Sequence, residues 1–315
     1  MSGKVLALSG GVGGAKLAFG LSQCVAADQL CIVANTGDDF SHLGVAICPD
    51  LDTVMYTLAG LANAVQGWGL EGESWQLMSA LDRLGGETWF RLGDRDMATH
   101  LRRTALLAEG LSLERVTASL CRALSVEQTL LPMSDDPVRT QVHTTQGWLA
   151  FQDYFVRQQC APQIDAIRFQ GIDSATAAQG FRQALVDPAL SAIVICPSNP
   201  FVSVDPILAL PDVREALIGH AAPVIAVSPI IAGAALKGPA AKMMAALAMP
   251  VCASAVAAYY GDLLDGFVID NADSSERSAI EALGLPVLQV NTIMRSTEAK
   301  IALAADCLEF AASLS

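Results

Sequence analysis

Aspartates gather in four short turn-forming runs of this chain, and these runs are where its residues could carry chemistry. They lie at the ends of apolar segments, at Asn35–Asp39, Cys48–Thr53, Leu92–Asp96 and Pro132–Asp136. Close carboxylates repel and shift each other's pKa values unless a cation lies among them. Oxygen ligands suit a hard cation such as Mg²⁺, which keeps several waters and bridges phosphate oxygens. The first two runs therefore predict a magnesium site.

Within these two runs the side chains have different structural alternatives. Asn, Gly and Asp are common turn formers, so Asp38 and Asp39 could be solvated side chains of a surface turn. Asp52 could cap a helix that begins near Thr53. Asp50 has no such alternative, and with Asp38 or Asp39 it makes an oxygen-rich group suited to Mg²⁺.

The third run lies within Trp89–Asp96, which combines aromatic rings, two arginines and two aspartates. Arginine binds phosphate through paired hydrogen bonds, and aromatic rings stack on flat ligands. The structural alternative is an Asp–Arg salt bridge at a helix start, with Asp96 capping the helix that carries His100. A lone histidine on a helix is more often structural than functional. For Asp135 and Asp136 of the fourth run, the sequence indicates no role other than lining the ligand cleft that the other runs would form.

A glycine-rich run, Gly10–Lys16, follows the first apolar segment and opens a helix that is expected from about Ala15. Glycines at such a place let backbone N–H groups approach a phosphate, and the helix N-terminus adds partial positive charge. A Walker P-loop needs Ser or Thr after the lysine, but Leu17 follows here. A dinucleotide fingerprint needs Gly or Ala at Lys16 and an acid at Asn35. We expect an anion or ligand site of another kind, and a ligand-free turn is the alternative.

Two proline-containing loops follow later strands, Cys196–Pro200 and Ser228–Gly233. Prolines fix the backbone, which would pre-organise Ser198 and Asn199 toward a ligand. The second loop leads to Lys237, a candidate phosphate contact. Either loop could instead be a plain crossover connection.

Short apolar segments alternate with helical patterns, which indicates a mostly parallel sheet with helices between its strands. Helical patterns dominate from Asp52 to about Cys121, which predicts an inserted helical region, and Thr140–Val156 predicts a hairpin around Gln146. The last helix is expected to begin near Ser296. No linker divides the chain, so we expect one domain over 1–315 with an insertion at about 54–135. The expected strands are Val5–Leu8, Leu30–Ala34, Ala192–Cys196, Val224–Val227, Phe267–Ile269 and Val287–Val290.

The composition narrows the function classes. The net charge is −13 and only 16% of the residues are charged, which argues against extended nucleic-acid binding. The eight cysteines are dispersed, without zinc spacing, which favours buried thiols in a reducing cytoplasm. The apolar stretch Ala221–Tyr260 is interrupted by Pro, Gly and Lys, so we expect no membrane span there, and the N-terminus offers no signal peptide.

The motifs, in this order, resemble the 2-phospholactate transferase family of deazaflavin coenzyme F-420 biosynthesis, including its bacterial phosphoenolpyruvate transferase branch. The resemblance covers roughly residues 4 to 300, and several motifs in one order are more specific than any single one. The motifs are Gly10–Lys16, Asn35–Asp39, Cys48–Thr53, Leu92–Asp96, Pro197–Pro200 and Ser228–Ile231.

The resemblance implies a Rossmann-like three-layer α/β/α fold, usually dimeric, and a Mg²⁺-dependent transfer. The donor would be a three-carbon acid linked through a diphosphate to guanosine, and the acceptor the deazaflavin alcohol Fo. The terminal ribityl hydroxyl would attack the phosphorus that bears the acid, and GMP would leave. Phosphoryl transfer asks mainly for alignment and charge neutralisation, which carboxylates, a metal and glycine-loop amides provide.

The resemblance also implies roles for individual residues. Those that would hold the donor are Gly11, Gly13, Gly14, Lys16, Ser198, Asn199, Ser228 and Lys237. Those that would meet Fo are Asp50, Arg91, Asp94, Asp96 and His100. Those expected around Mg²⁺ are Asp38, Asp39, Asp50 and, as a rival ligand, Asp52. The first three would also be the catalytic residues, and a general base is optional if the metal aligns the hydroxyl.

The loop after Ser228 departs from the family pattern, because Ala232 and Ala234 replace a glycine and a basic residue. Lys237 would then have to supply the lost charge. Which three-carbon acid is transferred, whether phospholactyl, phosphoenolpyruvyl or phosphoglyceryl, does not follow from the residues. Two other functions stay open: a nicotinamide-dependent oxidoreductase, suggested by the glycine turn, and a non-catalytic nucleotide- or deazaflavin-binding protein.

Overall fold

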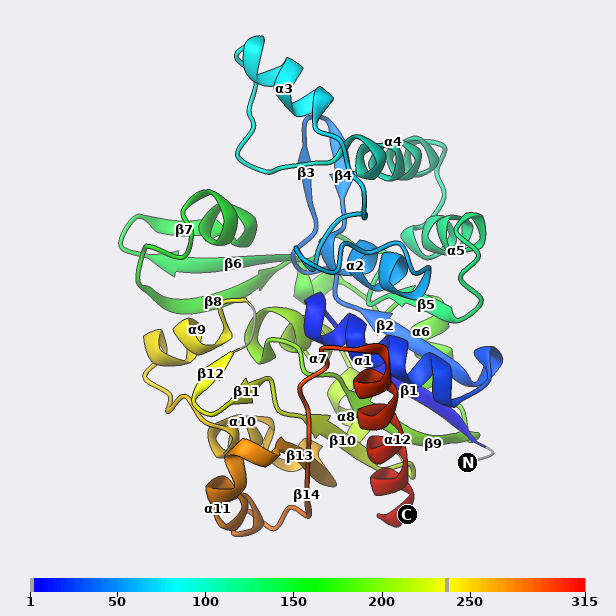
Figure 1. The fold of residues 1–315 in the computed structure, drawn as a ribbon, viewed down its shortest axis with the longest axis vertical. Helices are drawn as coiled ribbons and strands as arrows, with labels where there is room; N and C mark the ends of the chain where they lie inside the picture. The colour runs from blue at the N-terminus through cyan, green and yellow to red at the C-terminus, as the bar shows by residue number, and fades with distance from the viewer. Residues whose placement is uncertain (1–2, 236–237, 315) are drawn as a thin grey trace.

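A seven-stranded parallel sheet forms the centre of the computed structural model, which describes residues 3–235 and 238–314 (Figure 1). Every neighbouring pair of strands in it is parallel. The expected α/β fold with a parallel sheet is therefore confirmed. In spatial order the strands are β14 (Val287–Val290), β13 (Gly266–Asp270), β10 (Val224–Val227), β9 (Leu190–Ile195), β1 (Lys4–Ser9), β2 (Leu30–Ala34) and β5 (Thr129–Pro132).

The strand order turns around at β1. After β1 the chain builds β2 and β5 on one side, and then returns to add β9, β10, β13 and β14 on the other. The connections that leave β1 and β9 therefore diverge and leave a crevice between their carboxyl ends, which is where ligands bind in open α/β sheets.

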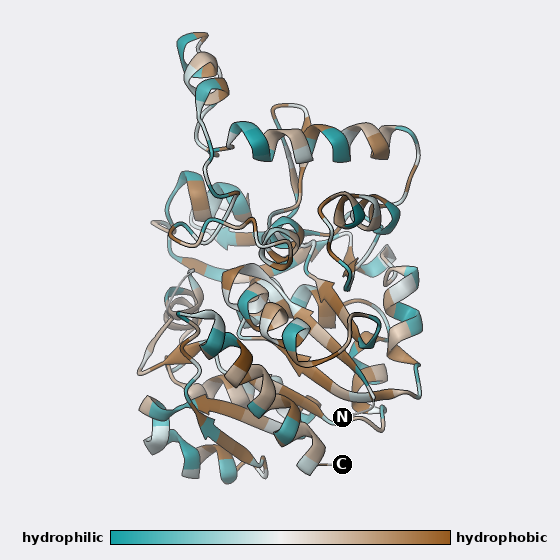
Figure 2. Cartoon of the chain, turned by 45° about the vertical axis from the view of Figure 1, so that its right-hand side comes forward, coloured by the Kyte–Doolittle hydropathy of each residue, from teal (hydrophilic) through white to brown (hydrophobic). Residues whose placement is uncertain are grey.

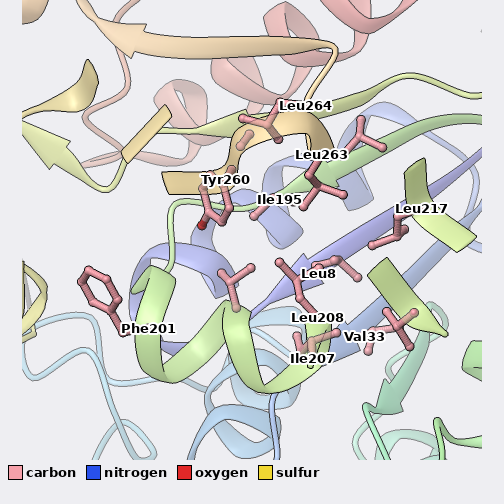
Figure 3. Close-up of a cluster of buried hydrophobic side chains, with 14 of the residues drawn as sticks. Leu8, Val33, Ile195, Phe201, Ile207, Leu208, Leu217, Tyr260, Leu263 and Leu264 are labelled. Carbon is pink, nitrogen blue, oxygen red and sulfur yellow. The ribbon is translucent and has the colours of Figure 1, made fainter. Parts of the chain in front are cut away.

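Helices cover both faces of the sheet, because its strands are apolar on both sides. Along β1, Leu6 and Leu8 enter one core and Val5 and Ala7 the other, as the alternation of a strand requires. Figure 3 shows Leu8 and Ile195 packed with side chains of α7 and α8. Three layers result, as expected. Figure 2 shows that the strands are the most hydrophobic segments.

Twelve α-helices are described within residues 3–235 and 238–314. They are α1 (Gly11–Cys24), α2 (Pro49–Leu58), α3 (Gln76–Arg83), α4 (Asp94–Ala108), α5 (Leu113–Ala123), α6 (Gln179–Leu185), α7 (Asp205–Leu208), α8 (Val213–Ile218), α9 (Ala240–Ala246), α10 (Ala253–Tyr260), α11 (Arg277–Glu281) and α12 (Thr297–Ser313). Ser296 caps α12 by accepting a hydrogen bond from the Ala299 N–H, so its expected start is confirmed. No helix of the described residues is long and apolar enough to cross a membrane.

Small antiparallel sheets lie outside the main sheet. They are β3 (Phe40–His42) with β4 (Val45–Ile47), β6 (Arg139–Thr144) with β7 (Gly147–Ala150) and β8 (Ile164–Gln170), and β11 (Ile230–Ile231) with β12 (Ala234–Ala235). The β6–β7 pair confirms the expected hairpin. The β3–β4 hairpin was not expected, because three-residue strands are too short for a periodicity signal. It lies with α3 and α4 beyond the end of the sheet opposite the termini (Figure 1).

The helical insertion at about 54–135 stays a prediction as a domain division. The segment holds the second half of α2 and all of α3, α4 and α5, but β5, a strand of the central sheet, lies near its end. Two helix starts differ from expectation. The first helix begins at Gly11, not near Ala15, and the second at Pro49, not near Thr53. Proline is favoured at a first helical position, where its missing N–H costs nothing.

Candidate functional site

The loops that follow β1 and β9 are locked together at the crevice. The Gly10 N–H donates to Ser198 Oγ at 3.0 Å, and this hydroxyl donates back to the Gly10 carbonyl at 2.7 Å. A Cβ at Gly14 would lie 2.6 Å from the same oxygen, and one at Gly13 would clash with the Pro197 carbonyl. The glycines are thus required for close packing, and the Ser198 hydroxyl is engaged with the glycine loop.

The N-terminus of α1 is occupied by a carboxylate of the chain itself. The Gly11 N–H donates to Asp50 Oδ1 at 2.6 Å, and the Asn35 amide donates to Asp50 Oδ2 at 2.9 Å. Burial raises the pKa of Asp50 to about 6, although the bonds from Asn35, Gly11 and Ser203 oppose this rise. The N-terminus of α1 thus binds the Asp50 carboxylate of the chain itself, and a ligand site at the glycine loop stays a prediction.

Asp38 forms a second buried carboxylate beside Asp50. The same Asn35 nitrogen lies 3.3 Å from Asp38 Oδ1, and Gln152 Nε2 donates to Asp38 Oδ2 at 3.0 Å. Burial, followed by the charge of Asp50, holds the pKa of Asp38 well above its usual range. Two anions in this position are costly without a positive charge between them.

Asp39 completes the group of carboxylates. Its Oδ1 is buried without a hydrogen-bond partner among the described residues, and burial raises its pKa to about 7. The Cys48 thiol and the charges of Arg139 and Arg103 oppose that rise. A buried oxygen that lacks a donor is typical of a site where a ligand or ion supplies the contact. The oxygen chemistry of Asp38, Asp39 and Asp50 suits a hard cation such as Mg²⁺, but within the described residues these three do not form a group with ligand atoms within 4.8 Å of one another, so the magnesium site stays a prediction.

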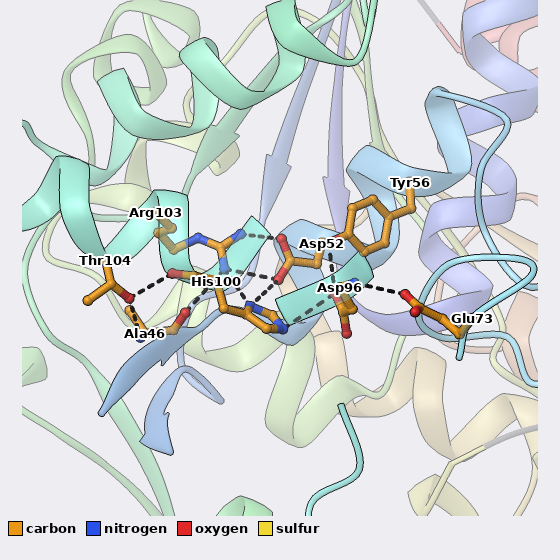
Figure 4. Close-up of polar contacts among 8 residues, drawn as sticks. All are labelled: Ala46, Asp52, Tyr56, Glu73, Asp96, His100, Arg103 and Thr104. Carbon is orange, nitrogen blue, oxygen red and sulfur yellow. Dashed lines mark hydrogen bonds and ion pairs between the residues drawn. The ribbon is translucent and has the colours of Figure 1, made fainter. Parts of the chain in front are cut away.

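Asp52 faces the other way, into a separate polar network (Figure 4). Arg103 binds both of its carboxylate oxygens, and His100 Nδ1 lies 3.6 Å from Asp52 Oδ2. The capping interpretation of Asp52 is wrong, since α2 begins at Pro49 and no side chain caps it. Asp52 is thus turned away from the Asp38–Asp50 group.

Asp96 lies in the same network and does not cap α4 either. It accepts a hydrogen bond from the Tyr56 hydroxyl at 2.8 Å and lies 3.4 Å from His100 Nε2. The cap of α4 is Gly93, which makes no side-chain bond. His100 is 2% exposed, so it lies beneath the surface.

Ligand atoms of Asp52, Asp96 and His100 all lie within 4.8 Å of one another, which makes this trio a candidate metal centre. Arg103 Nη1, however, lies 3.1 Å from His100 Nδ1. Since a guanidinium only donates, Nδ1 must accept, and Nε2 then carries the hydrogen that faces Asp96. No lone pair remains at Nε2 for a metal, and Arg103 already supplies the positive charge. We interpret the cluster as an ion network.

Asp94 and Arg95, in the third run (Trp89–Asp96), take part in hydrogen bonds at the starts of α3 and α4. The Asp94 carboxylate accepts from the Gln76 and Leu77 N–H groups at 3.0 Å each, at the start of α3. Glu73 in turn accepts from the Arg95 and Asp96 N–H groups at the start of α4. Each segment therefore caps the other's helix.

No salt bridge joins the aspartates and arginines of this run within residues 3–235 and 238–314, so that alternative is wrong. The Arg91 guanidinium lies 4.3 Å from the centre of the Trp75 ring instead.

An open cavity of about 340 Å³ adjoins the carboxylates. Asp38 and Asp39 form one wall, and the aromatic side chains of Phe40, Trp89 and Phe151 form others. This volume falls in the range of small-molecule sites. Trp89 is thus the residue of the aromatic run that reaches a ligand-sized space.

A second cavity of about 130 Å³ lies on the other side of Asp39 and is lined by Asp135 and Asp136. Asp135 accepts from the Glu114 N–H at 2.8 Å, and Asp136 accepts from the Thr176 N–H at 2.9 Å. These bonds give both aspartates structural partners.

The remaining donor-side residues lie at the carboxyl ends of strands. Asn199 Oδ1 accepts from the Phe201 N–H at 3.0 Å, and Ser228 Oγ accepts from the Ile230 N–H at 3.2 Å, so both stabilise their own loops. Lys16 is half-buried on α1. Lys237 lies outside the described residues.

Sequence reasoning missed three residues of the site. Asn35 was weighed only as the missing acid of a dinucleotide fingerprint, yet it joins Asp38 to Asp50. Gln152 lies more than a hundred positions from Asp38, and no local pattern connects the two. Arg103 gave no signal, because one arginine on an amphipathic helix is expected to be exposed.

Comparison with known proteins gives a match along almost the whole chain. The family model described as 2-phospho-L-lactate transferase CofD matches residues 5–297. A phosphoenolpyruvate transferase from Kitasatospora aureofaciens is 44% identical over 315 residues, which cover 98% of each chain. A 2-phospho-L-lactate transferase from Methanosarcina acetivorans is 39% identical over 294 residues, which cover 93% of this chain and 94% of the relative.

Among solved structures, a member of the UPF0052 family from Bacillus halodurans has a similar fold. The TM-score is 0.59 over 92% of this chain and 93% of that one, with 14% sequence identity. At this identity the likeness supports the fold alone.

Proposed function

Because the chain belongs to the CofD family of 2-phospho-L-lactate transferases, and is thus a transferase of F-420 biosynthesis, we propose that it transfers a phosphorylated three-carbon acid to Fo. The donor is that acid linked through a diphosphate to guanosine. The terminal ribityl oxygen of Fo bonds to the phosphorus that bears the acid, the bond from this phosphorus to GMP breaks, and the hydroxyl proton is released. The products are a phosphodiester and GMP.

One observation carries this proposal: the buried carboxylates of Asp38 and Asp50 share the Asn35 amide at the crevice, and Asp38 and the buried Asp39 line the adjoining aromatic cavity. Such a group suits transfer between phosphates, which depends on charge neutralisation and alignment. We propose that these three hold Mg²⁺, which when bound would neutralise charge on the donor phosphates. Asp52 is a weaker candidate because Arg103 binds it.

The aromatic cavity supports a place for the acceptor. Phe40 and Trp89 contact each other, with ring centres 6.0 Å apart, and form one aromatic wall on which a flat deazaflavin ring could lie, with Gln152 and Arg139 as polar partners in the same cavity. We assign the deazaflavin to this cavity. Arg91, Asp94, Asp96 and His100 do not line this cavity. The contribution of these four residues to Fo binding would therefore be indirect.

The donor would lie along the loops after β1, β9 and β10. Gly13, Gly14 and Lys16 on α1 are the proposed phosphate contacts, with Asn199 and Ser228 beside the guanosine. We propose phosphoenolpyruvyl as the acid, because relatives named phosphoenolpyruvate transferases reach 44% identity. A homodimer in the cytoplasm remains part of the prediction.

The test is a reaction of the pure protein with Fo, Mg²⁺ and each of the three guanosine-linked donors. Mass spectrometry should find the phosphodiester, and chromatography an equal amount of GMP. Asp50→Asn should lower turnover at least about a hundredfold, in the range of lost electrostatic stabilisation, while the exposed Asp28→Asn should retain it.

No product with any donor, from folded protein that binds Fo, would overturn the proposal in favour of a binding protein. Quenching of NAD(P)H fluorescence on titration would instead favour an oxidoreductase.

A further inference from the structure

Arg103 on α4 is the largest fully buried side chain of the described residues and is 1% exposed. A buried guanidinium is stable only where its donors and its charge are matched. Arg103 binds both oxygens of Asp52 on α2, and its Nη1 lies 3.3 Å from the Ala46 carbonyl on β4. One side chain thus connects three elements, as Figure 4 shows.

The next residue of α4 strengthens the same connection. Thr104 Oγ1 accepts from the Ala46 N–H at 2.8 Å and donates to the His100 carbonyl at 2.7 Å. Both backbone polar groups of Ala46 are therefore bound by α4. The middle residue of β4 is held in register with that helix.

The segment held in this way carries the candidate metal ligands. Asp38 and Asp39 directly precede β3, and Asp50 lies three residues after the end of β4. Cys48, between β4 and α2, lines the same cavity as Asp39. A shift of β4 would therefore move carboxylates at both ends of the hairpin.

The first turn of α2 is held from two sides. Residues two apart on a helix point about 200° apart around its axis. Asp50 accordingly faces Gly11 and Asn35, while Asp52 faces Arg103. The pair with Arg103 thus fixes the rotation of the turn that presents Asp50 to the crevice.

We propose that Arg103 is a positioning residue for the transfer reaction: through Asp52 and Ala46 it sets the placement of the Asp39 and Asp50 carboxylates that receive the metal. It lines neither of the two cavities beside these carboxylates. The inference rests on the proposed function, since that proposal makes these carboxylates the metal ligands.

The experiment separates positioning from mere stabilisation. The double variant Arg103→Met with Asp52→Leu removes both members of the ion pair together, and Asp96 keeps His100 and Tyr56 as partners. Thr104→Val is a second variant, which removes only the contacts of the hydroxyl with Ala46 and His100. Arg102→Met, on the exposed face of the same helix, is the matched control. Each protein is titrated with Mn²⁺ followed by electron paramagnetic resonance, and kcat and the KM for Fo are measured.

The double variant should bind Mn²⁺ at least tenfold more weakly and lose at least a hundredfold in kcat, with the KM for Fo changed less than threefold. Thr104→Val should lose about tenfold in kcat, and Arg102→Met should match the wild type. Arg103→Lys in the wild-type protein should also lower kcat, because an ammonium cannot bind both Asp52 and the Ala46 carbonyl as the forked guanidinium does.

Mn²⁺ affinity and kcat within threefold of wild type in both variants would overturn the inference, whatever their thermal stability. Failure of the wild type to bind Mn²⁺ would overturn it as well. If the wild type binds Mn²⁺ but makes no product, the proposed reaction fails alone. Weaker Mn²⁺ binding by the variants would then still support positioning.

Discussion

Asn35 joins two of the carboxylates that we propose as metal ligands. Its Nδ2 carries two hydrogens but faces three acceptors, at 3.3 Å from Asp38, 2.9 Å from Asp50 and 3.1 Å from the Val202 carbonyl. Two donors cannot satisfy three acceptors fully. The two carboxylates are therefore held close together yet remain short of donors.

Removing this amide should weaken the folded state. Asn35→Ala leaves both buried carboxylates without a shared donor, so we expect the free energy of unfolding to fall by about 2 kcal/mol. Urea denaturation at neutral pH measures it. The exposed Asn271→Ala is the control and should stay within about 0.5 kcal/mol of wild type. Equal changes in the two variants would refute the bridging role.

At the scale of elements, the site depends on how closely α1 approaches the loop after β9. Gly13 and Gly14 let the first turn of α1 lie directly against Pro197 and Ser198. The distance between α1 and the loop after β9 is thus set by contact at these two glycines. A larger residue at either position would push α1 and the loop apart.

Gly13→Ala tests that contact. Alanine favours helices, but its Cβ would clash with the Pro197 carbonyl, so we expect a loss of about 1–3 kcal/mol from overpacking. Gly219→Ala, whose Cβ would meet only the Glu215 carbonyl at 3.3 Å, serves as the control. Thermal unfolding compares the two. A Gly13→Ala protein as stable as wild type would show that the loops have room to separate.

A pH-dependent contact joins α7 to α10. Tyr259 donates its hydroxyl to Asp205, and burial raises the pKa of Asp205 to about 6. The folded state therefore keeps this proton where the unfolded chain has lost it. The contribution is present below about pH 4, the ordinary value for aspartate, and is lost as the pH rises to about 6.

Asp205→Asn should remove this dependence. The stability of wild type relative to Asp205→Asn should fall by about 3 kcal/mol between pH 4 and pH 7, by the usual conversion of a pKa shift. Urea midpoints at several pH values give the difference, with Asp28→Asn as an exposed control. If the urea midpoints of wild type and Asp205→Asn changed with pH in parallel, the raised pKa of Asp205 would be contradicted.

At the scale of the whole molecule, the strand order decides where a ligand can bind. The reversal between β1 and β9 opens a crevice there, and the loops after β1, β2 and β9 contribute to it. Residues of β3 and β6 line the cavity beside it, where β6 brings Arg139 and the segment after β7 brings Gln152 to Asp38 and Asp39.

Ligand binding should stabilise the whole fold. GDP with Mg²⁺ at about 100 times its Kd should raise the free energy of unfolding by about 2.7 kcal/mol and increase Tm by several degrees. NADH at the same concentration should leave Tm unchanged. Differential scanning calorimetry distinguishes them, and Asp50→Asn should lose most of the shift. A larger shift with NADH than with GDP would contradict the donor assignment.

The sequence by itself determined six of the seven strands of the sheet, all but β5. Runs such as Leu30–Ala34 and Val224–Val227 coincide with β2 and β10, because a strand buried on both faces must be apolar throughout. Likewise, the glycine run after the first strand could only form a tight strand–helix turn. These features depend on residues that are close in sequence, so they can be predicted without the tertiary structure.

Only the tertiary structure decided which partner each aspartate faces. Because α2 begins at Pro49 and not near Thr53, Asp50 faces the crevice while Asp52 faces Arg103. A few residues' difference in a helix start turns side chains to other partners, since each residue adds about 100°. The partners themselves, Gln152 above all, come from distant parts of the chain. Their contact depends on packing between elements, which no local pattern encodes.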